Sequence, residues 1–376
     1  MKKIALIGST GSIGKQVLNV CRRHPDKFKI ISLSAGNNET LFLEQVNEFC
    51  PKIATLSKPL VNTPKCDTQF FFGEDAFKSA ITKDADIVVV SLVGFKGILA
   101  VVDAIEKGKD IALANKESLV VGGELVMRLA KEKGVKITPI DSEHSAIWQA
   151  LGFDYNTPFN KIILTASGGA FRDFSEDALK VATAKDALRH PNWNMGAKIT
   201  VDCATLVNKA FEVVEAKWLY NTDFNNVEVI IHRESIIHSM VEFLDSSVIA
   251  QLSYPTMEIP IQLALDSTVR LYSAVNNLDF KKLSKLSFEE VDKKRFPCFD
   301  LVVETAKKGG SFPAVINGAN DTAVDLFLKG KISFPDIYLA LKGAVDNWSG
   351  EFDGTLESLI KANDFAVNFV KTHFGE

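Results

Sequence analysis

The stretch ITPIDSEHSAIWQ, residues 137–149, contains two carboxylates at the end of a strand-like apolar run, with no lysine or arginine inside it. Side chains alternate along an extended backbone, so Asp141 and Glu143 would point to the same side. Oxygen ligands of this kind suit a hard divalent cation such as Mg²⁺ or Mn²⁺. The alternative is a helix start, in which Asp141 or Ser142 caps the helix and Glu143 lies favourably near the helix dipole. A third carboxylate from elsewhere in the chain would favour the metal site.

A second stretch, ITVDCATLVNKAFEVVEAKWLYN, offers that carboxylate. We expect a strand that ends near Asp202 and a helix that Thr205 caps and that runs to about Tyr220. Asn208 and Glu212 then share one helix face, with Lys209 adjacent, so that Asn208 and Lys209 bind an anionic ligand and Glu212 binds the cation. The alternative is an exposed Lys209–Glu212 pair, worth only a few tenths of a kcal/mol.

Two loops carry further candidates. Ser167 and the two glycines after it follow a predicted strand and form either a phosphate-binding nest of backbone N–H groups or a plain turn. The loop RHPNWNMG contains His190 and Trp193, and the tryptophan either anchors the loop in a core or covers a ligand as part of a lid. For His232 we favour a hydrogen-bonded core residue, and for His238 both a core and a site role stay open.

The first third of the chain supplies the elements that position these groups. A buried strand over 2–8, the glycine turn GSTGSIG, a helix that stops at Pro25 and a strand over 28–36 form a βαβ unit. The glycine turn and the helix N-terminus suit a pyrophosphate, although an ordinary glycine turn is the alternative. The second strand ends in Ala35, Gly36, Asn37 and Asn38, without the carboxylate that would repel a 2′-phosphate, which favours NADP over NAD.

The alternation continues and predicts an α/β fold with a doubly wound parallel sheet. Further strands are expected over 86–94, 110–118 and 135–143, with helices over 95–108 and 118–134. Ligands of such sheets bind at the carboxyl ends of the strands, where residues 115–117 and the two opening carboxylates fall. Residues 227–255 alternate in short strands, which predicts a central α+β domain, and amphipathic helices predict a small helical C-terminal domain.

Composition narrows the class of protein. The chain has 376 residues, a net charge of -4 and 46% hydrophobic residues, which argues against nucleic acid as a main partner. No apolar run approaches the length of a membrane span, so no membrane partner is expected. Five scattered cysteines and no signal peptide predict reduced thiols in a cytoplasmic protein.

The chain contains a series of motifs that occur in this order: GSTGSIG, LANKESLV, DSEHSAIWQ, LTASGGAFRD, RHPNWNMG, VDCATLVNKAFE and IIHSMVEF. Because of these motifs, the chain resembles the 1-deoxy-D-xylulose 5-phosphate reductoisomerases. The resemblance implies a homodimer that uses NADPH and Mg²⁺ or Mn²⁺ to convert 1-deoxy-D-xylulose 5-phosphate into 2-C-methyl-D-erythritol 4-phosphate, in the non-mevalonate isoprenoid pathway. It implies a Rossmann-like NADPH-binding domain over 1–143, a catalytic domain over 144–270 with a lid around 186–197, a linker over 271–297 and a helical domain over 298–376.

The resemblance also assigns roles to residues. The metal ligands would be Asp141, Glu143 and Glu212, and the catalytic set adds Lys116, near the reacting carbonyl, and His190. The substrate would contact Lys116, Ser142, Glu143, Ser167, His190, Trp193, Cys203, Asn208, Lys209 and Glu212. NADPH would be surrounded by Thr10, Gly11, Ser12, Ile13, Gly36, Asn37, Asn38, Asn115, Glu117 and Gly196.

Two positions depart from the family pattern, and two other functions compete. Cys203 stands where the family usually has a phosphate-binding serine, and a thiol is a poor hydrogen-bond donor, so backbone groups or neighbours would take over there. Asn37 stands where members often carry a basic residue near the 2′-phosphate. The rival enzyme is a metal-independent NAD(P) dehydrogenase acting on a small semialdehyde. The non-enzyme alternative is a regulator that binds NADP and signals through its helical domain.

Overall fold

The computed structural model describes residues 1–61, 64–193, 195–266 and 269–375. Contacts divide the chain into two compact units, each of which gathers separate stretches of sequence. Unit 1 comprises residues 1–118, 126–145 and 256–275, and unit 2 comprises residues 119–125, 146–255 and 276–376. The three boundaries between the four predicted segments stay predictions, because this division follows contacts and not function.

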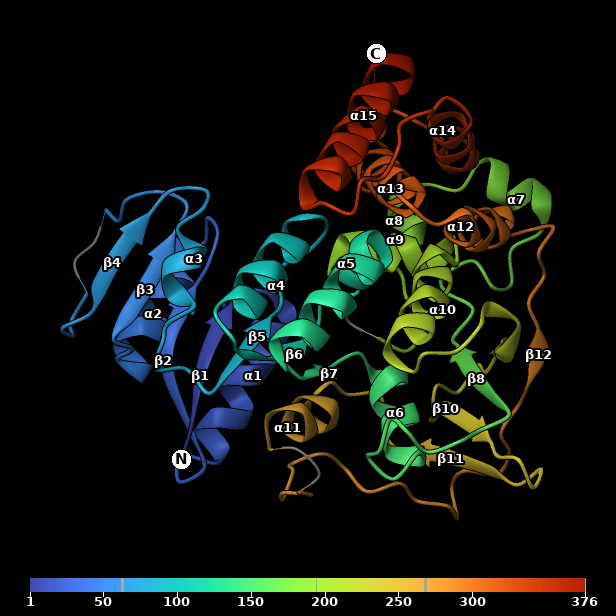
Figure 1. The fold of residues 1–376 in the computed structure, drawn as a ribbon. Helices are drawn as coiled ribbons and strands as arrows, with labels where there is room; N and C mark the ends of the chain where they lie inside the picture. The colour runs from blue at the N-terminus through green and yellow to red at the C-terminus, as the bar shows by residue number, and fades with distance from the viewer. Residues whose placement is uncertain (62–63, 194, 267–268, 376) are drawn as a thin grey trace. The chain divides into compact units, whose positions relative to one another are not determined.

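Unit 1 is built on a seven-stranded sheet in which every neighbouring pair runs parallel (Figure 1). The strands, in their spatial order, are β4 (Gln69–Phe72), β3 (Ile53–Leu56), β2 (Phe28–Ser34), β1 (Lys2–Ile7), β5 (Ile87–Val90), β6 (Asp110–Leu113) and β7 (Ile137–Pro139). The order reverses direction at β1, which is the point where doubly wound sheets bind their ligands. The predicted α/β class is therefore confirmed.

Unit 1 also contains helices, most of which connect its strands. They are α1 (Ser12–Arg23), α2 (Glu39–Phe49), α3 (Phe77–Ala80), α4 (Lys96–Glu106), the ends of α5 (Glu117–Lys133), the first turn of α6 (Ser142–Ala150) and α11 (Glu258–Asp266). The central strands are buried on both faces, as the continuous apolar runs predicted. Helix α11 returns from a distant part of the sequence and buries Ile261 and Leu265 in the same core.

The sheet of unit 2 is mixed. Its strands, in spatial order, are β11 (Val248–Leu252), β10 (Ile237–Glu242), β8 (Lys161–Ala166), β9 (Val227–Ile231) and β12 (Glu289–Glu290). Only β8 and β9 pair in parallel, and the remaining pairs are antiparallel. The predicted α+β character of this part is thus confirmed.

Unit 2 contains the middle of α5, the rest of α6 and several further helices. The further helices are α7 (Glu176–Lys180), α8 (Ala184–Ala187), α9 (Ala197–Ala204), α10 (Val207–Leu219), the 3-10 turn η1 (Phe224–Asn226) and a C-terminal group of α12 (Pro297–Lys308), α13 (Phe312–Leu328), α14 (Phe334–Asp346) and α15 (Leu356–Phe374). Helix α13 packs against α14 and α15, while α12 contacts α10 and α13 contacts α9 (Figure 1). The helical C-terminal region therefore shares one compact unit with the central sheet.

One predicted element is wrong. Residues 199–202 were expected to form a strand, but they lie inside helix α9. Their β-branched side chains favour a strand only weakly, and tertiary burial of Thr200 and Val201 outweighs that preference. The Thr200 hydroxyl donates to the Gly196 carbonyl at 2.8 Å, so its polar group is satisfied within the helix.

Helix α5 is bent in the middle, at a glycine pair. Gly122 has φ −140° and ψ 34°, which is not helical, but the residues on both sides of it are helical and the helix ends at Gly134.

Among the described residues, no helix combines the length and the apolar character needed to cross a lipid bilayer.

Candidate active site

The glycine turn after β1 is the segment for which nucleotide binding is predicted. Gly8 has φ +100°, and the N–H groups of Gly8 and Ser9 both donate to the Ser34 carbonyl, at 2.9 and 2.8 Å. A Cβ on Gly14 would lie 2.2 Å from the Gly8 carbonyl oxygen, so only glycine fits there. Gly11 is the N-cap of α1 and makes no side-chain cap, which leaves the first N–H groups of the helix available to an anion.

The end of β2 supports that loop through α2. Asn38 caps α2, accepting from the Leu41 N–H at 3.2 Å, and Gly36 and Asn37 are exposed beside it. Gln45, buried on α2, donates to the Ser9 carbonyl at 3.0 Å and ties the helix to the glycine turn. Sequence reasoning missed Gln45, because nothing in the sequence distinguishes it from an exposed glutamine on an amphipathic helix.

Asn115 and Glu117 sit at the carboxyl end of β6 and are both buried. The Asn115 amide donates to Glu117 at 2.9 Å and to the carbonyls of Leu92 and Gly94, at 3.0 and 3.1 Å. The Gly94 N–H donates to the other Glu117 oxygen at 3.2 Å. These two residues therefore fix the loop after β5, and their predicted contact with NADPH stays a prediction.

Lys116 and Asp141 form a buried ion pair inside unit 1. The Lys116 Nζ lies 2.5 Å from Asp141 Oδ2, and the side chains are only 8% and 10% exposed. Asp141 Oδ1 accepts from the Glu143 N–H at 3.1 Å, which is the capping bond at the start of α6. The helix-start interpretation therefore applies to Asp141, and Glu143 lies inside α6 and not on an extended strand. The metal-site interpretation stays a prediction, because the other Asp141 oxygen faces the Lys116 ammonium.

Neighbouring polar and charged residues set the pKa of Asp141. Ser142 donates a hydrogen bond to Glu143, and carboxylate oxygens of Asp141 and Glu143 lie within 4.8 Å of each other. Burial would raise the pKa of the Asp141 carboxyl, but Lys116 and His144 outweigh it and hold that pKa well below its usual range. Asp141 is therefore charged at neutral pH and can act as a metal ligand.

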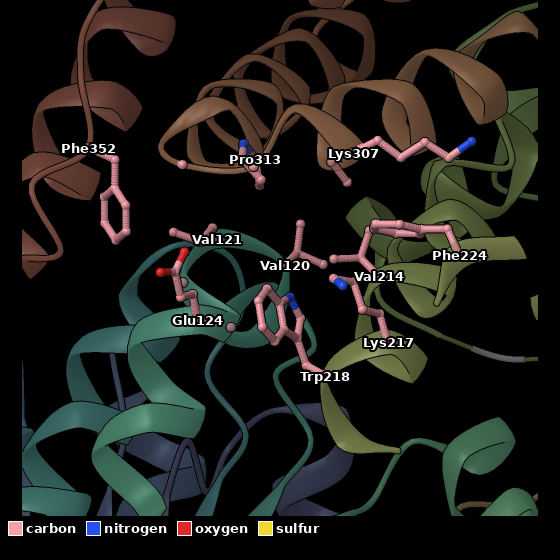
Figure 2. A pocket seen from close by; sticks show the side chains of 15 residues that line it. Val120, Val121, Glu124, Val214, Lys217, Trp218, Phe224, Lys307, Pro313 and Phe352 are labelled. Carbon is pink, nitrogen blue, oxygen red and sulfur yellow. The ribbon is translucent and has the colours of Figure 1, made fainter. Parts of the chain in front are cut away.

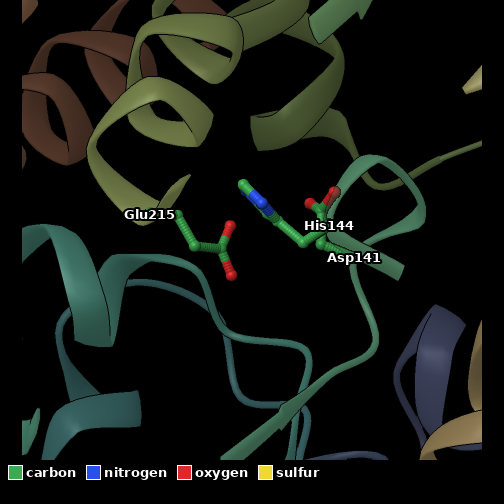
Figure 3. Close-up of side chains that lie close together, drawn as sticks. All are labelled: Asp141, His144 and Glu215. Carbon is green, nitrogen blue, oxygen red and sulfur yellow. The ribbon is translucent and has the colours of Figure 1, made fainter. Parts of the chain in front are cut away.

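His144 and Glu215 are two buried ionisable residues that sequence reasoning did not select. A ring nitrogen of His144 lies within 4.8 Å of an Asp141 carboxylate oxygen, inside the first turn of α6 (Figure 3). Glu215, also drawn in Figure 3, is buried on α10, one turn after Glu212. The signal that existed was spacing: His144 follows Asp141 by three residues and Glu215 follows Glu212 by three.

Helix α10 carries the second predicted set in its first turns. The Asn208 amide donates to Glu212 at 2.6 Å, and Lys209 forms an ion pair with the same carboxylate. All three side chains are buried, so the alternative of an exposed surface pair is wrong. The helix begins after Leu206, which has φ +60°, and Thr205 accepts from the Val207 N–H at 3.3 Å instead of acting as the N-cap.

The loop after β8 packs against the end of α9. Gly168 and Gly169 both have positive φ, and a Cβ on Gly169 would lie 2.3 Å from the Cys203 carbonyl oxygen. The Gly169 N–H donates to the Ser167 hydroxyl at 3.2 Å. Cys203 is half-buried at this contact, and its assignment to phosphate binding stays a prediction.

His190 closes onto that loop from the predicted lid. Its Nε2 lies 2.9 Å from the Ser167 hydroxyl, and its Nδ1 accepts from the N–H groups of Asn192 and Trp193, at 3.2 and 3.0 Å. Because two N–H donors face Nδ1, the proton of the neutral ring is on Nε2. Burial, and secondarily the charge of Arg172, lower the pKa of His190 to about 4.

The rest of the lid is held by its polar residues. Asn192 donates to the Arg233 carbonyl at 2.7 Å and to the Ser235 hydroxyl at 2.6 Å. Trp193 is half-buried and meets the edge of His238, with ring centroids 6.1 Å apart. Asn194, within the predicted lid, lies outside the described residues, and Gly196 is the N-cap of α9.

His232 is the hydrogen-bonded core residue that we expected. Its Nδ1 lies 2.9 Å from the Ser287 carbonyl, and its Nε2 accepts from the N–H groups of Ile236 and Ile237, at 3.2 and 3.1 Å. His238, for which both roles stayed open, is buried on β10, and its ring contacts that of Trp193. This contact favours a role in positioning the tryptophan.

Three family models match consecutive parts of this chain. Residues 4–123 match 1-deoxy-D-xylulose 5-phosphate reductoisomerase, residues 137–220 match its C-terminal domain, and residues 252–368 match a DXP reductoisomerase C-terminal domain. Together they span most of the sequence.

Curated relatives with the same name match over nearly their full lengths. The 1-deoxy-D-xylulose 5-phosphate reductoisomerase of Pelotomaculum thermopropionicum is 46% identical, over 98% of this chain and 97% of the relative. That of Listeria monocytogenes serotype 4a is 44% identical, over 99% of this chain and all of the relative.

Solved structures of that enzyme have the same fold. The enzyme of Zymomonas mobilis in complex with NADPH is 36% identical, with a TM-score of 0.91 over 99% of this chain and 98% of that one. A DOX-P reductoisomerase in complex with NADPH, fosmidomycin and magnesium is 33% identical, with a TM-score of 0.94 over 100% of this chain and 98% of that one.

Proposed function

Because the chain belongs to the 1-deoxy-D-xylulose 5-phosphate reductoisomerase family, we propose that it rearranges and reduces 1-deoxy-D-xylulose 5-phosphate to 2-C-methyl-D-erythritol 4-phosphate. The observation that carries the proposal is the match over the full length of named relatives, at 46% identity for one of them. The reaction uses NADPH and a divalent cation, since solved relatives were obtained with NADPH and with magnesium. The enzyme is thus an NADP-dependent oxidoreductase with an isomerase step.

We assign the cation to Asp141 and Glu143 of unit 1 and Glu212 of unit 2. The donor set fits, since three carboxylates offer the oxygen ligands that Mg²⁺ and Mn²⁺ prefer. Lys116 pairs with Asp141 and Lys209 pairs with Glu212, so an ammonium group already lies beside each of these two carboxylates. When bound, the metal supplies Lewis-acid stabilisation of negative charge on substrate oxygens.

We assign the substrate to polar residues, several of which contact these carboxylates. Lys116 can donate to the substrate carbonyl, because its ammonium is buried and therefore little hydrated. Ser167, Asn208 and Lys209 can bind the phosphate and hydroxyl groups, and that remote binding energy positions the reacting carbons. Ser142, Glu143, Cys203 and Glu212 complete the proposed contacts.

The predicted lid is proposed to exclude water from the reaction. His190 is neutral at physiological pH and carries its proton on Nε2, so it can donate to a substrate oxygen in place of Ser167. Trp193, supported by His238, is the apolar cover. Such a cover matters because the aldehyde formed by the rearrangement must be reduced before it hydrates or escapes.

NADPH is proposed to bind at the carboxyl edge of the parallel sheet. The uncapped N-terminus of α1, with Thr10, Gly11, Ser12 and Ile13 around it, suits the pyrophosphate. The exposed turn of Gly36, Asn37 and Asn38 offers the 2′-phosphate only neutral groups, so Asn37 sets how strongly NADPH is preferred over NADH. Asn115, Glu117 and Gly196 complete the proposed contacts.

A turnover assay tests the substrate assignment. We expect loss of NADPH absorbance when 1-deoxy-D-xylulose 5-phosphate is added with Mg²⁺ or Mn²⁺, and no loss when EDTA is present. A folded protein that binds NADPH but reduces small semialdehydes with EDTA present, and leaves the sugar phosphate untouched, would instead be the metal-independent dehydrogenase. Binding of NADPH without turnover of either substrate class would support the regulator.

The oligomeric state and location are proposed on separate grounds. Strand β11 is an edge strand with exposed Val248 and Ile249, and Leu244 is exposed in the preceding turn, which gives a homodimer an apolar surface to bury. Light scattering should give twice the chain mass of 41.3 kDa, and a monomer would contradict the assignment.

The proposed location is the cytoplasm, because the five free cysteines are consistent with a reducing compartment. Cell fractionation tests this location.

A further inference from the structure

Unit 2 contains a cavity of about 230 Å³ that none of the proposed catalytic residues line. It lies where the bend of α5 faces the second half of α10 and the turn between α12 and α13 (Figure 2). The walls are mainly apolar, with Val120 and Val121 on one side and Val214, Trp218 and Phe224 on another. The cavity is therefore a separate feature of the fold and not part of the active site.

A glycine pair in α5 lines this space. Gly122 leaves the helical conformation, and a Cβ on Gly123 would lie 2.2 Å from the Trp218 ring. A side chain larger than glycine therefore does not fit at position 123, where the bent helix packs against the tryptophan beside the cavity. Close packing would normally fill a cavity of this size, since voids larger than a water molecule are few in protein interiors.

Lys217 gives the cavity its charge. Its ammonium lies 5.2 Å from the ring centroids of both Trp218 and Phe224. Figure 2 shows its nitrogen turned toward the space between Trp218 and Val120. Within residues 1–61, 64–193, 195–266 and 269–375, it forms no ion pair, and it is only partly exposed. No carboxylate of the described residues therefore competes with a ligand for this ammonium.

The other charged groups of the lining do not compete for that role. Lys307 is paired with Glu304 at 2.8 Å, and in Figure 2 its nitrogen points away from the cavity. Glu124 is exposed to solvent, so water hydrates its carboxylate and it needs no cationic ligand. Charge and shape together favour an anion with an apolar body.

We propose that this cavity is a binding site for a small organic anion, a carboxylate carried on an apolar body about the size of one aromatic ring. The size follows from the volume, because a cavity of about 150 Å³ holds one benzene molecule and this one also leaves room for a carboxylate. The apolar body contacts the valines and Trp218, and the carboxylate pairs with Lys217. Binding needs neither NADPH nor the sugar phosphate, so its test is independent of the proposed function.

Titration calorimetry with benzoate tests the site in the full-length protein, with benzyl alcohol as the neutral ligand of the same shape. For a ligand this small we expect a dissociation constant of about 1 mM for benzoate. Benzyl alcohol should bind about tenfold more weakly, because it lacks the charge-assisted bond to Lys217. Lys217→Gln should weaken benzoate by about the same factor and leave benzyl alcohol unchanged.

Two further variants control for loss of structure and for binding elsewhere. Lys217→Arg keeps the charge and should bind benzoate like the wild type, and so should Lys307→Gln, which removes the paired lysine. Benzoate that bound the phosphate site would bind Lys217→Gln as tightly as the wild type, and that result would overturn the proposal. So would the absence of saturable binding to a wild-type protein with a normal melting curve.

Discussion

Removing Lys116 should destabilise the metal-free protein more than removing any exposed lysine. Its partner Asp141 is only 10% exposed and the two charged atoms lie 2.5 Å apart, so the variant Lys116→Met leaves a buried carboxylate without its cation. Loss of one partner of a buried pair costs about 3–5 kcal/mol. His144 and the Glu143 N–H still face the carboxylate, so we expect the lower end of that range.

Urea unfolding followed by circular dichroism measures this change, in EDTA and in saturating Mn²⁺. The divalent cation can replace the missing ammonium, so Mn²⁺ should stabilise Lys116→Met more than the wild type. Lys133→Met is the matched control on the same helix, because its pair with Glu106 is half-exposed and worth at most about 1 kcal/mol. An equal loss for both variants, or an equal gain from Mn²⁺ in the wild type and in Lys116→Met, would refute the reasoning.

The sign of the pH dependence follows from the Asp141 pKa. This pKa is lower in the folded protein than the value of about 3.9 in an unfolded chain, so the unfolded state takes up the proton first as the pH falls. The contribution of the pair is therefore fully present above about pH 4 and is lost below it. The stability that the wild type gains from this pair should accordingly be constant from about pH 5 to pH 8 and should fall below that range, as urea unfolding of the wild type over pH measures.

The remaining predictions concern two glycines and the lid histidine. Gly14→Ala should weaken NADPH binding and lower stability by about 1–3 kcal/mol, because its Cβ would lie 2.2 Å from the immobile Gly8 carbonyl; fluorescence titration and thermal melting check this. Gly123→Ala should cost about as much stability, since its Cβ would lie 2.2 Å from the Trp218 ring, but should leave the NADPH affinity measured in the same titration unchanged. His190 has a pKa of about 4 in the fold and about 6.5 when unfolded, so the unfolded state binds more protons between these values and stability falls as the pH is lowered from 6.5 to 4. The drop in melting temperature from pH 7 to pH 4.5 should therefore be smaller for His190→Gln than for the wild type. Equal drops in the two proteins would contradict the assignment.

The sequence predicted the parallel sheet well because its signals are local. Buried strands of parallel sheets are continuous apolar runs, and the glycine turn follows the first of them directly. Residues 199–202 misled the prediction, since β-branched residues favour a strand locally while the helix is selected by burial against distant parts of the chain. Local preference cannot report contacts that form only after folding.

The candidate site was predictable in its residue types but not in its pairings. The spacing of Asn208, Lys209 and Glu212 placed them together, but only the fold distinguishes a buried pair from an exposed one. The link from Gln45 to Ser9 joins residues 36 positions apart, and no sequence pattern announces it. The cavity beside Gly122 could not be predicted either. In the sequence a glycine pair indicates only low helix propensity, and its contact with Trp218 is known only from the fold.

The measurement that tests the central claim most directly is a Mn²⁺ titration, followed by electron paramagnetic resonance, of the wild type, Glu212→Gln and Glu215→Gln. Both glutamates are buried on α10, one turn apart, so the two variants are matched in burial, in helix and in charge removed. Loss of groups that only support a metal ligand costs about 10–100-fold in affinity, so loss of a ligand itself should cost at least about 100-fold. We predict that loss for Glu212→Gln and near wild-type affinity for Glu215→Gln. Full Mn²⁺ affinity in Glu212→Gln, or its loss in Glu215→Gln alone, would contradict the assignment of Asp141, Glu143 and Glu212 as the metal ligands.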